Sequence, residues 1–187
     1  MKKTSLALVG LALTSSFSAK ALEGDYDGYD DFSSFSAVQD ITSRILRVAT
    51  QYANAISCGG VEIEPSSILA LHPLKSRDDF HSAKFAVVWG GSIGCSGGSG
   101  SYGTHVAIVS AGYGFYVIPE ESSPMIRFES PRFINKLVGN TEDTIILDAK
   151  AHAEGDSSNF PSLRVKITLK KDQNYNWSIS NKEVMEK

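Results

Sequence analysis

The sequence contains few of the residues on which metal and thiol chemistry depend. It has two cysteines, Cys58 and Cys95, and four scattered histidines without an i, i+4 pair or a neighbouring thiolate. A zinc site needs several such ligands brought together by the fold. Because two cysteines in an oxidising compartment most often pair, we expect a Cys58–Cys95 disulfide and no metal or other cofactor.

The sequence also lacks a long apolar run. The apolar stretch at residues 5–17 is shorter than the roughly 20 residues that a helix needs to span a bilayer. Lys2 and Lys3 precede this stretch, and Ala19-Lys20-Ala21 follows it as a small-residue cleavage site. Residues 1–21 therefore have the pattern of a signal peptide. We expect a periplasmic or secreted protein, cleaved after Ala21, with no integral membrane segment and no cysteine for lipid attachment there.

Positive charge becomes scarce once that segment is removed. The whole chain has 18 Lys+Arg against 21 Asp+Glu. Loss of Lys2, Lys3 and Lys20 would leave 15 against 21, a net charge of −6 on the remaining chain. A negative balance of this size disfavours nucleic acid and anionic lipid as partners. The remaining length fits one domain with a substantial core.

Three segments are predicted: a signal peptide at residues 1–21, an acidic, flexible arm at 22–35 and a single domain at 36–187. The arm is rich in aspartate, glycine and aromatic residues. Its acidic residues do not have the spacing of a calcium-binding helix–loop–helix. We therefore interpret it as an arm without a metal site.

The domain should begin with one amphipathic helix. Ser36 and Gln39 have the spacing of a capping box, and Gly59-Gly60 is typical of a helix C-terminus. Between them, apolar residues recur every three or four positions, which places them on one helix face. These residues are Val38, Ile41, Ile45, Val48, Tyr52 and Ile56.

Beyond Gly60 the pattern changes to that of β-strands. Residues 163–170 alternate between apolar and polar side chains, and three of the polar ones are Arg or Lys, which is typical of an antiparallel sheet with one face in water. No strand–helix–strand order is present to build a parallel sheet. We predict an α+β fold in which the N-terminal helix packs on one curved, mainly antiparallel sheet. We expect seven to nine strands from ten candidate segments, residues 61–64, 68–71, 84–89, 105–109, 115–118, 125–128, 133–138, 144–149, 163–169 and 176–179.

Half of the residues at positions 90–103, GGSIGCSGGSGSYG, are glycine. The segment matches the nucleophile-elbow pattern G-x-S-x-G and the dinucleotide pattern G-x-G-x-x-G, but both need a helix next, and a strand is expected here. Glycines also serve sharp turns beside a disulfide, or a recognition loop that a partner can approach closely. Both roles stay open. The candidate binding residues, chosen with nearby aromatics that often anchor interfaces, are Gly97, Gly98, Ser99, Gly100, Tyr102, Tyr113 and Tyr116.

Fragments of this region resemble the NlpC/P60 cell-wall peptidases. The fragments are Trp89-Gly90-Gly91, Cys95-Ser96-Gly97 and Thr104-His105-Val106-Ala107-Ile108-Val109. The resemblance implies a peptidoglycan hydrolase in which Cys95 is the nucleophile and His105 its base. The chain departs from the family because Gly94 replaces the Asp before the cysteine and because only nine residues separate Cys95 from His105. A disulfide to Cys58 would remove the nucleophile.

A longer series of segments resembles a group of small exported bacterial proteins that includes lipoproteins of the LppP/LprE type. The segments are WGGSIGCSGGSG, THVAIV, IRFESP and LVGNTEDTIIL. This resemblance implies a fold and an exported location, and no chemistry. The chain lacks the lipid-attachment cysteine, and the cysteine-free segment at residues 158–162 stands where those proteins carry Cys-Cys-Pro-Ser.

Three functions follow as hypotheses. We prefer a non-catalytic periplasmic or secreted domain that binds a protein partner as an inhibitor, immunity factor or envelope-assembly accessory. This preference rests on export, small size and the absence of a complete catalytic set in the sequence. The alternatives are the cysteine hydrolase with Cys95 and His105, and a purely structural role in the envelope.

Overall fold

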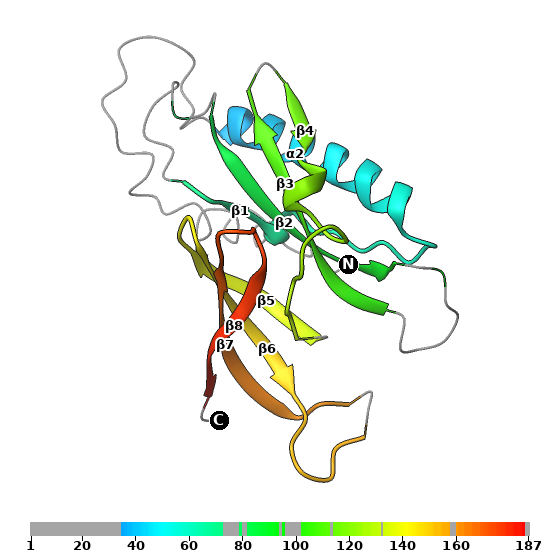
Figure 1. Cartoon of the computed structure of the whole chain (residues 1–187), viewed down its shortest axis with the longest axis vertical. Helices are drawn as coiled ribbons and strands as arrows, with labels where there is room; N and C mark the ends of the chain where they lie inside the picture. The colour runs from blue at the N-terminus through cyan, green and yellow to red at the C-terminus, as the bar shows by residue number, and fades with distance from the viewer. Residues whose placement is uncertain are drawn as a thin grey trace, which may run out of the picture.

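The computed structural model describes residues 35–72, 79, 82–93, 95, 102–112, 114–131, 133–157 and 160–185, with side chains from residue 39 (Figure 1). These residues form one long helix and two antiparallel sheets, with strand orders β1-β2-β3-β4 and β5-β6-β7-β8. The predicted α+β class is confirmed. The bounds are α2 Phe35–Ile56, η2 Pro65–Ser67, β1 Ile68–Ala70, β2 Lys84–Ser92, β3 Tyr102–Ala111, β4 Phe115–Val117, η3 Pro119–Glu121, β5 Phe133–Asn140, β6 Thr144–Ala151, β7 Leu163–Lys171 and β8 Trp177–Val184.

Helix α2 matches the predicted amphipathic helix. It begins at Phe35, one residue earlier than expected, and ends at Ile56. Gly59 and Gly60 then take φ values of +113° and +72°, which glycine adopts without side-chain strain. The side chain of Ser36, and with it the predicted capping box, lies outside the described part. The apolar face is confirmed from Ile41 onward, since Ile45, Ala49 and Ala53 are fully buried and Ile41, Leu46, Val48, Tyr52 and Ile56 pack beside them. The side chain of Val38 lies outside the described part.

The pair of strands β2 and β3 lies at the centre of the molecule. The two strands are antiparallel, in register from Lys84 opposite Ser110 to Ser92 opposite Tyr102. Successive side chains of a strand point to opposite faces, so these strands contribute to two separate cores. The face toward α2 includes Phe85, Val87, Trp89, Ala107 and Val109, and the face toward the second sheet includes Ala86, Val106 and Ile108.

The strands form two sheets, where one curved sheet was expected. The first sheet ends at β4, and the chain then passes through η3 before β5 starts the second sheet. Because β2 and β3 are apolar on both faces, each face needs a covering layer. Helix α2 covers one face, and the apolar inner face of the second sheet covers the other (Figure 1). The result is three layers, helix, sheet and sheet.

Most predicted strands are present at nearly the expected positions, and two are not. In residues 61–64, only Glu62 pairs, as an isolated bridge with Gly90. In residues 125–128, Phe128 makes a single bridge with Trp177. The predicted alternation in β7 is confirmed, because Val165 and its apolar neighbours at every second position are buried.

A buried carboxylate lies on the outer face of the second sheet. The side chain of Asp148 on β6 is only 3% exposed. It accepts hydrogen bonds from Arg164 Nε at 3.2 Å, from Arg164 Nη2 at 2.6 Å and from Asn135 Nδ2 at 3.1 Å. The hydrogen bonds from Arg164, more than any other contact, lower the pKa of Asp148 below its ordinary value of 3.8. The ion pair therefore joins β6 and β7, and the hydrogen bond from Asn135 joins β5 to them.

Replacement of Arg164 by methionine should lower the midpoint of urea unfolding at pH 7, because it leaves a buried carboxylate without its main donor. A lowered folded-state pKa means that the stability from Asp148 is complete above its ordinary pKa and is lost as the pH falls through the folded value. The difference between Arg164→Met and wild type should therefore shrink toward pH 3. Lys170→Met, on the same strand, should lower the midpoint much less. A difference that is independent of pH would contradict this account.

Candidate functional site

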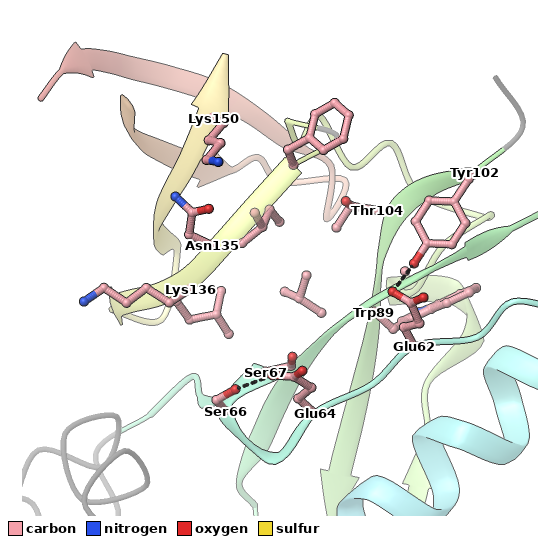
Figure 2. Close-up of a pocket in the computed structure, with 15 residues that line it drawn as sticks. Glu62, Glu64, Ser66, Ser67, Trp89, Tyr102, Thr104, Asn135, Lys136 and Lys150 are labelled. Carbon is pink, nitrogen blue, oxygen red and sulfur yellow. Dashed lines mark hydrogen bonds between the residues drawn. The ribbon is translucent and has the colours of Figure 1, made fainter. Parts of the chain in front are cut away.

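A groove of about 490 Å³ lies between the two sheets, where β5 faces β2 and β3 (Figure 2). Residues 62–67 and the ends of β2 and β3 form one wall, and residues 133–137 form the other, with Lys150 of β6 beside them. This volume is in the range of small-molecule and cofactor pockets, roughly 300–1,000 Å³. The groove is therefore a preformed candidate site.

The first wall is built around Gly90. Its N–H donates to Glu62 O and its carbonyl accepts from Glu62 N, both at 2.9 Å. The hydroxyl of Tyr102 lies over the backbone of Gly90 and donates to Glu62 Oε2 at 2.7 Å (Figure 2). A Cβ atom on Gly90 would overlap this hydroxyl and lie 2.9 Å from Tyr102 Cζ. Only glycine therefore lets the Tyr102–Glu62 contact form over the strand.

Burial, the hydrogen bond to Glu62 and the nearby carboxylate charge together raise the pKa of Tyr102 to about 12, with burial the largest cause. The phenol consequently stays protonated at neutral pH and acts as a donor. It fixes the carboxylate of Glu62 at the rim of the groove. Glu64, two residues on, is also exposed and accepts a hydrogen bond from Ser66 Oγ at 3.3 Å. This wall is therefore acidic.

The second wall is the edge strand β5. In the part of the chain that the structure describes, the backbone of residues 134–139 pairs with β6 alone. Lys136 and Lys150 are exposed on this side, and Figure 2 shows Lys136 pointing away from β2. The groove therefore has carboxylates on its first wall, and the two lysines stand at the outer margin of its second wall.

Both ends of β5 are tied to the first sheet. Near its start, Thr104 Oγ1 donates to Pro131 O at 3.3 Å. At its end, the side-chain amide of Asn140 donates to Ala70 O. These two contacts hold the edge of β5 beside the first sheet and leave the groove between them.

The structure separates the predicted binding residues. Tyr102 lines the groove. Tyr116 is 57% exposed on β4, opposite Ser110, which is roughly 26 Å along β3 from Tyr102. The other candidates, Gly97, Gly98, Ser99, Gly100 and Tyr113, lie outside the described residues. Of the two described candidates, only Tyr102 belongs to the groove.

The predicted disulfide between Cys58 and Cys95 is present, with the two Cα atoms 5.2 Å apart. It joins the segment after α2 to the segment after β2, and Cys95 has a positive φ of 54°. Because the sulfur of Cys95 is bonded, no thiolate exists there in this form. His105 lies with Nε2 at 3.2 Å from Gly91 O, and its ring centroid is 4.6 Å from that of Trp89. Burial lowers the pKa of His105.

Several groove residues had no signal in the sequence that marked them as a site. Glu62 and Glu64 alternate with Val61 and Ile63, which indicated a common side for the two acids but not what faces them. Lys136 comes from a strand far along the chain. The contact between these segments depends on how the two sheets pack, which periodicity does not encode.

No protein-family model, curated protein sequence or solved structure matches this chain. Within the described residues, no group of three or more His, Cys, Asp or Glu side chains is placed to hold a metal ion. The groove is therefore interpreted from its own geometry and charge.

Replacement of Gly90 by alanine should lower the free energy of unfolding by about 1–3 kcal/mol, because the added methyl group overlaps Tyr102. Gly139→Ala is the matched control, since a Cβ there meets nothing within 4 Å. In a Tyr102→Phe background, Gly90→Ala should cost less, because the atom closest to the new methyl group is gone. Urea unfolding of the four variants measures this coupling. If Gly90→Ala lowers the free energy of unfolding equally in both backgrounds, the Tyr102 hydroxyl does not lie over Gly90.

Removal of the disulfide by Cys58→Ser with Cys95→Ser should lower the free energy of unfolding by about 4 kcal/mol, given the loop that the bond closes. The two cysteines are 37 positions apart. Reduced wild type should unfold at the same urea concentration as the double variant. Intact mass after alkylation should show two reactive thiols only after reduction. Fast alkylation of Cys95 in unreduced protein would contradict the disulfide.

Proposed function

We propose that this chain, after export and removal of residues 1–21, is a non-catalytic binding domain that engages a protein partner through the groove. The observation that carries the proposal is a preformed groove with one acidic wall and, as its other wall, a strand edge whose backbone pairs with no described residue on that side. Strand edges of this kind bind other chains readily. Three classes of partner fit: an enzyme that this domain inhibits, a toxin that it neutralises as an immunity factor, or a component of envelope assembly.

The proposed location rests on residues 1–21 and on one feature of the described chain, the disulfide. A disulfide persists in oxidising compartments such as the periplasm, and the chain carries the Cys58–Cys95 bond. No helix in the described residues is long and apolar enough to cross a membrane. Export itself is inferred from residues 1–21, which lie outside the described part of the chain.

Charges of both signs around the groove favour a protein over a nucleic acid. Glu62 and Glu64 on the first wall would repel a phosphate backbone, which proteins bind through clustered Lys and Arg. A protein surface can match both the acidic wall and the lysines on the opposite side, and such complementarity gives specificity. The alternative, a cysteine hydrolase with Cys95 and His105, requires a free thiol at a position that is disulfide-bonded.

Site-specific photo-crosslinking in cells tests the proposal. A photoreactive phenylalanine analogue at Ser66, which lines the groove, should give a discrete adduct with an envelope protein. The same analogue at Arg47, exposed on α2, is the matched control and should give none. The double variant Glu62→Lys with Glu64→Lys should reduce the Ser66 adduct at least several-fold, because it reverses the charge of one wall. Absence of an adduct at Ser66, or the same adducts from both positions, would contradict the proposal.

A further inference from the structure

The edges of the two sheets differ in what surrounds them. In the described chain, β1 and β4 end the first sheet and have three residues each. β8 and β5 end the second sheet, and β8 is exposed over almost its whole length. Of these two edges in the described chain, β5 is the one that lines the groove. An unpaired edge of N–H and C=O groups is a template for another strand.

The edge of β5 is shaped by two irregularities. Its register with β6 shifts between Ile134 and Lys136 and again between Leu137 and Gly139. Between these shifts, Lys136 and Leu137 stand in regular register with Asp148 and Leu147. Such bulges limit open-ended pairing along an edge. They leave a short, defined stretch of edge at the groove.

The length of that stretch is set by the contacts at its ends. Residues 133–137 line the groove, and the Thr104–Pro131 and Asn140–Ala70 hydrogen bonds close the space beyond them. At about 3.3 Å per residue, the lining stretch of β5 is roughly 13 Å long. This length matches an extended segment of four or five residues.

Resting on the function proposed above, we infer that the occupant of the groove is an extended segment of a partner protein that adds to β5 as a further strand. Its backbone would pair with the edge of β5. Alternate side chains would then point to opposite faces of the second sheet. This mode of recognition takes affinity from the main chain and specificity from every second side chain.

The charges on each face specify the sequence pattern of that segment. On the outer face, added side chains would lie beside Lys136, with Lys150 on the next strand. Asp148, which is opposite Lys136, forms its direct ion pair with Arg164, and Lys136 acts on it only as a nearby charge. The ammonium group of Lys136 can therefore pair with an acidic residue of the partner. On the inner face, Leu137 packs toward the core. The segment should therefore carry acidic residues outward and apolar residues inward.

Glu62 and Glu64 on the first wall favour the same orientation of the added segment. An inverted segment, with acidic side chains pointing inward, would bring them to the side of Glu62 and Glu64. Like charges brought together in this way are a common means of excluding the wrong partner or register. The two walls thus select a segment in which acidic and apolar side chains alternate, with the acidic ones pointing outward and the apolar ones inward.

A synthetic pentapeptide of alternating valine and glutamate, with capped ends, is the probe. We expect the mature, disulfide-bonded protein to bind it, with amide protection at residues 134–139 in hydrogen–deuterium exchange. N-methylation of every second residue in one register should weaken binding at least ten-fold, because those N–H groups face β5. N-methylation in the other register should leave the affinity unchanged within about two-fold, because alternate N–H groups of an edge strand point away from its neighbour.

A charge exchange tests the role of Lys136. Lys136→Glu should weaken binding of the valine–glutamate peptide about three- to ten-fold, in keeping with cross-strand charge pairs, and should strengthen binding of a valine–lysine peptide. Lys182→Glu on β8 is the matched control, with the same change of net charge on an exposed strand, and it should leave both affinities unchanged.

Other outcomes separate this inference from the proposed function. If the Ser66 cross-link forms but both N-methylated series bind equally, or neither peptide binds, strand addition is wrong while the groove remains the binding site. If neither the cross-link nor peptide binding occurs, both proposals fail. A concentration-dependent dimer with protected β5 amides and no peptide binding would assign the edge to a second copy of this chain and overturn the inference.

Discussion

Burial of both faces of the β2–β3 pair is the constraint on which the rest of the structure depends. Successive side chains in these strands belong to two different cores. Leaving either face in water would expose apolar area at a cost of roughly 25 cal/mol per Å². One covering layer is therefore insufficient. Helix α2 supplies the first layer, and the second sheet supplies the other.

The groove follows from the way the second sheet covers this pair. Its apolar inner face packs on the middle of β2 and β3. Its edge strand β5 starts beside the end of the pair at which Gly90 and Tyr102 lie and runs from there toward Ala70 of β1. Contacts at both ends of β5 fix its position. The Tyr102–Glu62 hydrogen bond orders the opposite wall. A site with two walls of different charge is thus a consequence of stacking two sheets over one shared core.

The sequence predicts local structure well and the assembly less well. The period of α2, the glycine stop at Gly59-Gly60 and the alternation in β7 are local patterns, and each element formed where expected. The number of sheets was not predicted, although the unbroken apolar run of β2, against the alternation of β7, carried a signal for burial on both faces. Of the candidate binding residues, Tyr102 lies in the groove, but Lys136 was missed because no local pattern shows which segments face each other across two sheets.

Amide hydrogen exchange on the cross-linked complex and on the free protein tests the central claim most directly, because the second sheet contains its own control. β5 and β8 are the two edges of that sheet, and only β5 borders the groove. If the groove is the binding site, exchange should slow in residues 134–139 and in residues 62–67, while β8 exchanges at the same rate in both samples. Slowing confined to β8 or to α2, with β5 unchanged, would show that the partner binds elsewhere.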